Sequence, residues 1–162
     1  MANSADTWSG PDASVGVPIA VSVRIRATPE QVWAVLERVE DHVEWMRDAV
    51  AIRFEGQQRR GVGTAFLCDT KVGPFRLTDA MAITEWSEGH LMGVRHQGLV
   101  TGSGRFSLLT PVPGTTVVHW EERLCFPWFL GGLLTAFCAR PVLSHLWRGN
   151  LEALRAQVEA AG

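Results

Sequence analysis

Residues 143–158 read LSHLWRGNLEALRAQV, and this stretch decides the fold because it carries the longest amphipathic helix pattern of the chain. From Leu143 onward, apolar residues recur at offsets of 3, 4, 8, 11 and 15, which places them on one face of a helix. The opposite face carries charged residues, namely Arg148, Glu152, Arg155 and Glu159. Pro141 is expected to kink or break this helix near its start.

Most of the preceding sequence alternates apolar and polar residues, as half-buried β-strands do. Seven strands are expected, over residues 19–26, 50–56, 61–72, 75–86, 91–97, 104–109 and 115–126. The gaps between the last six have the length of hairpin turns, which indicates an antiparallel sheet that is mostly a meander. One face of such a sheet is apolar and needs a cover.

Two short helices are expected between the first and second strands. Thr28 and Gln31 have the spacing of a capping box, and Pro29 suits the first helical position. Asp41 and Glu44 repeat the capping signature and are expected to open the second helix. Neither helix is long enough to cover a sheet, so we expect them to close one end of it.

These elements predict one α+β domain over residues 18–162. In it, a strongly curved seven-stranded antiparallel sheet wraps around the long C-terminal helix in a helix-grip arrangement. Residues 1–17 are rich in Ser, Gly, Asp and Pro and are expected to form a flexible tail. This tail lacks the basic start and apolar centre of a signal peptide.

Composition argues against several classes of function. The chain has 15 basic and 17 acidic residues and no basic run longer than Arg59-Arg60, which argues against nucleic acid as a partner. Cys68, Cys125 and Cys138 have neither disulfide nor zinc-site spacing, which favours a reducing, cytoplasmic location. No phosphate-binding loop or metal-ligand cluster is found, so no cofactor is expected. A monomer or a homodimer is consistent with these features.

Residues 124–139 read LCFPWFLGGLLTAFCA and carry no charge. Sixteen residues interrupted by Pro127 and Gly131-Gly132 fall short of the roughly 20 that a membrane-spanning helix needs. We expect a buried or cavity-lining segment, with peripheral membrane contact as the alternative. Residues 126–137 are also a candidate mobile gate over the interior.

Three short sequences resemble one superfamily. The sequence ATPEQVW at 27–33, Trp45 in the second short helix and GTTVVHW at 114–120 resemble the START-like, or SRPBCC, superfamily, in particular its polyketide cyclase/dehydrase-like branch. The resemblance implies a deep cavity between the sheet and the long helix, which ligands enter near the N-terminal part of that helix. It supplies no universal catalytic residue. The chain has no tyrosine, so a mechanism that depends on a cavity tyrosine has no counterpart here.

Strand alternation places three titratable residues on the apolar face of the sheet: Asp79, His96 and Glu122. Burial would raise the pKa of each carboxyl group, which suits general acid–base catalysis by Asp79 or Glu122. As alternatives, Arg95 or Arg105 pairs with these carboxylates, or a β-bulge after Asp79 turns its side chain outward. His96 is a candidate for orienting a ligand, with a half-exposed strand position as its alternative.

The residues predicted to line a ligand pocket are Phe66, Cys68, Met81, His96, Phe106, Trp120, Phe129, Leu133 and Phe137. Wide aromatic pockets suit flat apolar ligands, so we expect binding of a hydrophobic small molecule such as a polyketide, an aromatic or a lipid-like compound. The alternatives are a polyketide cyclase or dehydratase and a protein-interaction module resembling the heat-shock ATPase activators. The remaining histidines are expected at surface or edge positions: His42, His90, His119 and His145.

Overall fold

The computed structural model describes residues 17–162, except for the side chains of Val17, Leu130, Leu133, Leu134, Ala136 and Phe137. Its elements are β1 (Val17–Ile25), α1 (Pro29–Leu36), η1 (Val39–Glu44), β2 (Ala49–Glu55), β3 (Ala65–Val72), β4 (Phe75–Ser87), β5 (Leu91–Gln97), β6 (Thr101–Val112), β7 (Thr115–Cys125), η2 (Trp128–Leu130) and α2 (Gly132–Ala161). Residues 1–16 of the predicted tail lie outside the described residues. Its last residue, Val17, is the first residue of β1.

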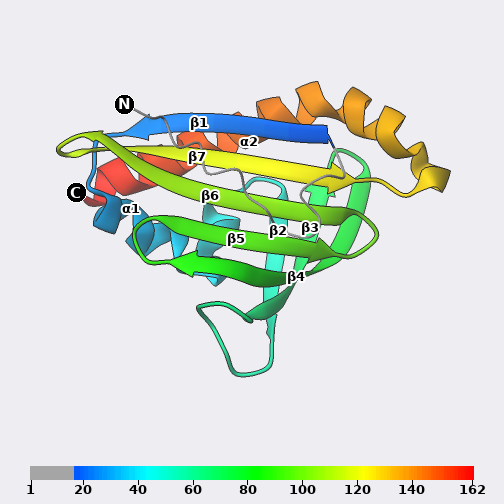
Figure 1. Cartoon of the computed structure of the whole chain (residues 1–162), viewed down its shortest axis with the longest axis horizontal. Coiled ribbons are helices and arrows are strands. Elements are labelled where there is room, and N and C mark those ends of the chain that lie inside the picture. Colours follow the sequence, from blue (N-terminus) through cyan, green and yellow to red (C-terminus); the bar gives the residue numbers. More distant parts are fainter. Residues whose placement is uncertain (1–16) are drawn as a thin grey trace, which may run out of the picture.

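The described strands form a seven-stranded sheet in the order β1-β7-β6-β5-β4-β3-β2, and each neighbouring pair is antiparallel. Strands β2 to β7 form a meander, and β1 joins it at the β7 edge. Helix α2 runs along one side of the curved sheet next to β1 and β7, while η1 lies against β2 (Figure 1). The structure therefore confirms the predicted α+β helix-grip fold.

The alternation that predicted the strands also builds the core. Along β7 the buried and half-buried residues alternate strictly, so one face of the strand points inward. Trp147, Leu151 and Leu154 of α2 are at most 5 % exposed and pack within the same core. Burying a side chain of this size contributes roughly 1.5–3 kcal/mol, so the stripe of α2 is a main source of stability.

The two helix-start predictions have different outcomes. The capping box of α1 is present, because the Gln31 N–H donates to Thr28 Oγ1 and the Thr28 N–H donates to Gln31 Oε1. The second prediction is wrong, because η1 begins at Val39 and no side chain caps it. Its tight 3₁₀ turns satisfy the backbone locally, as where the Asp41 N–H donates to the Arg38 carbonyl.

Most strand boundaries lie within two residues of the prediction, and larger differences occur at the start of β3 and at both ends of β6, which ends at Val112 rather than at residue 109. Strand β3 starts at Ala65 rather than at residue 61, because Gly61 and Gly63 have φ values of +84° and +91°, which an extended strand does not contain. Strand β6 starts at Thr101 rather than at residue 104, because Thr101 already pairs with Gln97 of β5 and with Cys125 of β7.

Register shifts turn individual side chains away from the face that alternation predicts. A shift between Ala49 and Ala51 leaves Val50 52 % exposed. In β4 the shift lies between Ile83 and Glu85, so Asp79 precedes it and keeps its inward direction. The predicted alternative, a bulge directly after Asp79, is absent from the described strand.

Helix α2 begins at Gly132 and continues through Pro141, so the predicted break does not occur. The uncharged stretch 124–139 is divided among the end of β7, η2 and the first turns of α2. Within residues 17–162, no helix combines the length and apolar character that a membrane crossing requires. All three cysteines are free thiols.

Candidate functional site

Asp79, His96 and Glu122 lie on the inner face of the sheet, contributed by β4, β5 and β7. Asp79 and Glu122 are 8 % and 6 % exposed, and the His96 side chain is 14 % exposed. The sequence placed these residues on one face, and the structure buries Asp79 and Glu122 there and His96 in large part. The half-exposed alternative for His96 is therefore not what the structure shows.

The His96 and Glu122 side chains form a buried ion pair, with 3.1 Å between Nε2 and Oε2. They reach each other across the intervening strand β6, where Gly102 pairs with His96 and Gly104 pairs with Glu122. A Cβ atom at Gly104 would overlap the Glu122 carboxylate. The glycine at this position therefore allows a carboxylate of β7 to reach a histidine of β5.

An aromatic row holds the Glu122 carboxylate from the other side. Trp120 Nε1 donates a hydrogen bond to Glu122 Oε1 over 2.9 Å, so both carboxylate oxygens have a partner. The Trp120 ring stacks on Trp147 of α2, with 5.1 Å between centroids and 30° between planes, and lies 4.8 Å from the Phe106 ring. Packing between sheet and helix thus fixes the orientation of Glu122.

Asp79 is different, because its Oδ1 atom is buried and has no hydrogen-bond partner among the described residues. Its carboxylate lies over Gly98, where a Cβ atom would overlap it. Burial raises the pKa of Asp79, and the nearby His96 opposes that rise. The predicted alternative of a pair with Arg105 is wrong, since Arg105 Nε lies 3.2 Å from Glu85 Oε2.

His96 has a raised pKa despite its burial. Burial alone lowers the pKa of an imidazole, but the charges of Glu122 and Asp79 and the hydrogen bond to Glu122 outweigh it. On the inner face, His96 therefore lies near two carboxylates. Both oxygens of Glu122 have a hydrogen-bond partner, whereas the buried Oδ1 of Asp79 has none among the described residues. Such a group can accept and donate hydrogen bonds and can move a proton.

Sequence analysis missed Asp48 and Asn150. The Asn150 side chain is fully buried, donates from Nδ2 to Asp48 Oδ1 over 2.6 Å and accepts from the Arg47 N–H over 3.0 Å. Burial raises the pKa of Asp48, and the charge of Glu122 adds to the rise. The sequence could have indicated a buried position for Asn150, because it lies three residues after Trp147 on the apolar stripe of α2.

The predicted apolar lining is only partly inside. Phe66, Cys68, Phe106 and Trp120 are buried, and Met81 is partly buried against them. Burial raises the pKa of the Cys68 thiol. The structure does not support an interior position for Phe129, which is 60 % exposed. The turn at η2 ends at Gly131 with φ +90°. The segment between β7 and α2 extends beyond the end of the sheet (Figure 1).

Leu133 and Phe137 lie outside the described side chains. Within the part of the chain that is described, no three His, Cys, Asp or Glu side chains gather into a metal-binding group.

The remaining predicted histidine positions have mixed outcomes. His90 and His145 are exposed, and His119 is partly exposed and bonds to Ser22. The prediction for His42 is wrong, because it is 5 % exposed and its Nε2 lies 2.7 Å from the Leu36 carbonyl. Burial lowers the pKa of His42 to about 4, so the neutral ring donates this hydrogen bond.

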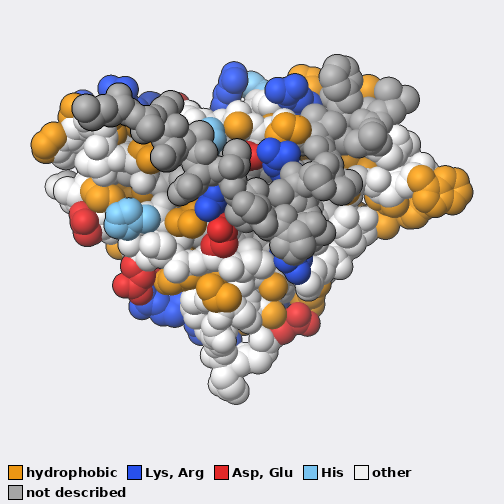
Figure 2. Space-filling model, viewed as in Figure 1, with side chains coloured by type: hydrophobic (Ala, Val, Ile, Leu, Met, Phe, Trp, Pro, Cys, Tyr) orange, Lys and Arg blue, Asp and Glu red, His pale blue; other side chains and the backbone are white. Residues whose placement is uncertain are grey.

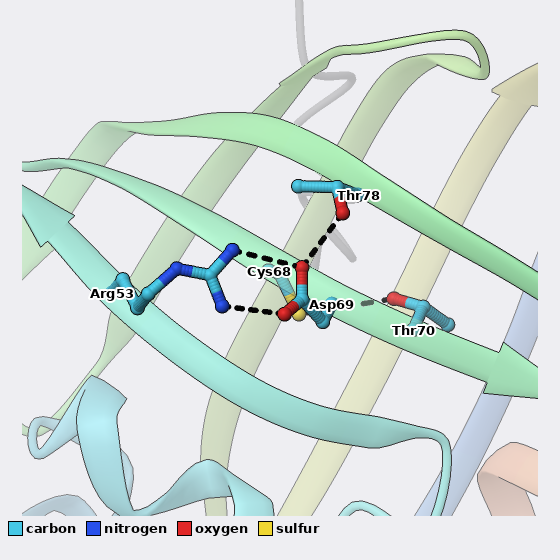
Figure 3. Close-up of polar contacts among 5 residues, drawn as sticks. All are labelled: Arg53, Cys68, Asp69, Thr70 and Thr78. Atoms are coloured by element: carbon cyan, nitrogen blue, oxygen red, sulfur yellow. Dashed lines mark hydrogen bonds and ion pairs between the residues drawn. The ribbon is translucent and has the colours of Figure 1, made fainter.

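A second polar cluster lies on the outer face of β2, β3 and β4 (Figure 3). Asp69 Oδ1 accepts from Arg53 Nη2 over 3.0 Å and from Thr78 Oγ1 over 2.7 Å, and Asp69 Oδ2 pairs with Arg53 Nη1. These hydrogen bonds lower the pKa of Asp69 to about 2. A shallow depression beside them is lined by Val50, Asp69, Thr70, Arg76, Leu77 and Thr78. Both carboxylate oxygens of Asp69 are satisfied, so this cluster offers no free acceptor.

Residues 17–159 match the sequence profile of a family described as polyketide cyclase / dehydrase and lipid transport. No curated protein matches the chain by sequence.

Solved structures share the fold at low sequence identity. A START superfamily protein from Mycobacterium smegmatis is 16 % identical, with a TM-score of 0.72 over 90 % of this chain and 99 % of that one. The Zhui aromatase/cyclase from Streptomyces sp. R1128 is 15 % identical, with a TM-score of 0.65 over 90 % and 92 % of the two chains. The di-domain aromatase/cyclase StfQ of the steffimycin pathway is 16 % identical, with a TM-score of 0.74 over 93 % of this chain and 53 % of that one.

Proposed function

This chain belongs to the polyketide cyclase/dehydrase and lipid transport family, and we propose that it binds a hydrophobic small molecule against the inner face of its sheet. The observation that carries the proposal is Asp79 Oδ1, a buried carboxylate oxygen with no partner among the described residues. Leaving such an acceptor unsatisfied costs about 1–3 kcal/mol. A ligand hydroxyl that donates to this oxygen would recover that free energy.

The surrounding side chains define the chemistry of the ligand. Phe66, Met81 and Phe106 supply apolar, polarisable surface near the polar group. Asp79 accepts a hydrogen bond, and a protonated His96 offers a donor. This combination suits a largely apolar molecule with a hydroxyl group and a carbonyl group near one end, such as a polyketide, a phenolic aromatic or a hydroxylated lipid.

The binding test is native mass spectrometry of the purified chain, followed by titration with a panel of flat aromatics and fatty acids. We expect a bound mass that is lost on denaturation, or binding of at least one panel member. Asp79→Asn should weaken a hydroxylated ligand about tenfold and leave its deoxy analogue unchanged, because the hydroxyl exchanges a charged acceptor for a weaker, neutral amide oxygen. Glu121→Gln is the matched control, since Glu121 lies one residue from Glu122 on the outer face of β7. Absence of any adduct and of any panel binding would overturn the proposal.

The same group also favours a second candidate function, dehydration of a β-hydroxy ketone. Its supporting observation is the juxtaposition of Asp79 with the His96–Glu122 ion pair. Asp79 would take the proton from the carbon beside the carbonyl group, a C=C bond would form, and the C–O bond would break. Protonated His96 would donate its proton to the departing hydroxyl, which leaves as water.

A turnover assay separates the two functions. If the chain is a dehydratase, Asp79→Asn and Glu122→Gln should abolish water loss from a β-hydroxy ketone that still binds. Turnover that is unchanged in both variants would dismiss the enzymatic role and leave binding alone. Asp79→Asn keeps the side-chain volume and is not expected to destabilise the fold, so a loss of turnover in this variant reports on the charge and the proton rather than on packing.

A further inference from the structure

Trp128 and Phe129, here called the aromatic tip, are the feature that the proposed function leaves unexplained. They are 87 % and 60 % exposed, and their rings meet edge to face with 6.0 Å between centroids. Both belong to η2, which joins β7 to α2. Figure 2 shows hydrophobic side chains gathered at the right-hand end of the molecule, where Figure 1 shows the chain leaving β7 for α2. Two adjacent exposed aromatic residues mark an interaction surface.

The segment that contains the aromatic tip carries charge of one sign. From Arg123 to Leu151, both included, the sequence contains three arginines and no Asp or Glu, in a chain whose net charge is −2. Two of these arginines, Arg140 and Arg148, are exposed on α2 and form no ion pair among the described residues. Arg140 lies roughly 12 Å along the helix from its start, so it is close enough to act on the same surface as the tip.

We infer that the aromatic tip docks this protein on an anionic lipid bilayer. Trp and Phe favour the region between headgroups and acyl chains, where an indole keeps its N–H near water and buries its ring. Arg140 meets the lipid phosphates, Arg148 adds positive charge further along α2, and each basic residue near an anionic surface strengthens binding severalfold. A projecting tip inserts into a fluid surface without a preformed pocket, which a folded protein partner would have to supply.

The test is co-sedimentation of the full chain with vesicles of phosphatidylcholine alone and of phosphatidylcholine mixed with phosphatidylglycerol. We expect binding to the mixed vesicles and little binding to the neutral ones. The double variant W128A/F129A should bind the mixed vesicles at least about tenfold more weakly, because it removes the apolar area that enters the bilayer. Arg140→Gln with Arg148→Gln should weaken binding severalfold and reduce its dependence on salt.

Phe75→Ala is the matched control, because Phe75 is 73 % exposed but belongs to the β3–β4 hairpin. It should leave vesicle binding unchanged. Equal binding of W128A/F129A and the parent chain would overturn the proposal, as would the absence of binding to either vesicle. A parent dimer that W128A/F129A converts to a monomer, without vesicle binding, would assign the tip to a second copy and also overturn it.

This proposal stands apart from the ligand-binding function. The tip is exposed and Asp79 is buried on the inner face, so Asp79→Asn should leave vesicle binding intact. Conversely, W128A/F129A should leave intact the affinity for a water-soluble ligand measured without vesicles.

Discussion

Strands β3 and β4 carry two carboxylates whose chemistry differs completely because they face opposite sides of the sheet. Asp69 pairs with Thr78 on the outer face, while the next pair along the two strands, Cys68 with Asp79, lies on the inner face. On the outer face Arg53 and Thr78 satisfy Asp69 and lower its pKa to about 2 (Figure 3). On the inner face Asp79 Oδ1 is buried without a partner among the described residues, and burial raises its pKa.

The comparison shows how one strand pair can separate stability from a binding site. An exposed, fully bonded carboxylate has nothing left to offer a ligand. A buried carboxylate with a free oxygen destabilises the empty protein, and a ligand that binds there recovers the free energy. Most of the substitutions below compare a buried polar group with a more exposed one.

The largest effect is expected from breaking the inner ion pair. Glu122→Gln removes the charge that faces His96 and leaves a buried histidine facing an amide. We expect a loss of about 4 kcal/mol in the free energy of unfolding at neutral pH. Glu121→Gln, on the outer face of the same strand, should cost less than about 0.5 kcal/mol. Urea unfolding measures both values, and a similar cost for the two variants would contradict the inner-face assignment.

The two buried histidines test what the inner carboxylates contribute. His42 has a pKa lowered from 6.5 to about 4, so its neutral form is favoured in the folded state. Its contribution is full above pH 6.5 and falls as the pH drops toward 4, by about 3 kcal/mol. His96 has a raised pKa, so its contribution is present below pH 6.5 and is lost as the pH rises through its folded pKa.

The free energy of unfolding, measured between pH 6.5 and 4 for His42→Phe and for the parent chain, isolates the contribution of His42 to stability. The variant should lose most of the decline between pH 6.5 and 4. An unchanged decline would show that His42 titrates normally.

A smaller effect is expected from the buried amide of α2. Asn150→Ala leaves Asp48 without the Nδ2 donor and should cost about 2 kcal/mol. Gln157→Ala removes a hydrogen bond to Glu44 on the exposed side of the helix and should cost under about 0.5 kcal/mol. Thermal unfolding of the two variants compares them directly, and equal melting temperatures would contradict the role of the Asp48–Asn150 contact.

The smallest expected effect is a gain in stability, whereas the other substitutions lower it. Asp79→Asn removes a buried charge and should raise the free energy of unfolding of the empty protein by about 1 kcal/mol. Asp69→Asn removes a bonded carboxylate and should lower it. A loss of stability in Asp79→Asn, measured by urea unfolding at neutral pH, would mean that Asp79 already has a partner in the empty protein.

Local patterns predicted most of the fold. The period of two in the strands, the stripe of the long helix and the Thr28–Gln31 capping box each depend on neighbours within a few residues. The inward direction of Asp79, His96 and Glu122 followed from the same alternation. The differences from the prediction have local physical reasons: positive φ angles at Gly61 and Gly63 delay the start of β3, and local 3₁₀ turns replace the expected cap of η1.

The parts of the site that could not be predicted depend on pairing between distant segments. The Asp48–Asn150 contact joins residues that are 102 positions apart. The contact that Glu122 makes with His96 past Gly104 depends on the register of β6 against β7, which the sequence of β6 alone does not specify. The outward position of Phe129 depends on the turn that ends at Gly131, where φ is +90°.

The most direct test of the central claim is a chemical-shift map of the protein titrated with a ligand that the panel identifies. The indole N–H of Trp120 is the key probe, because it donates to Glu122 at the centre of the inner face. We predict that the largest shifts occur at Trp120, His96 and Asp79, while Thr78 and Asp69 on the outer face stay unchanged. Shifts confined to the outer face, with Trp120 unmoved, would contradict the account.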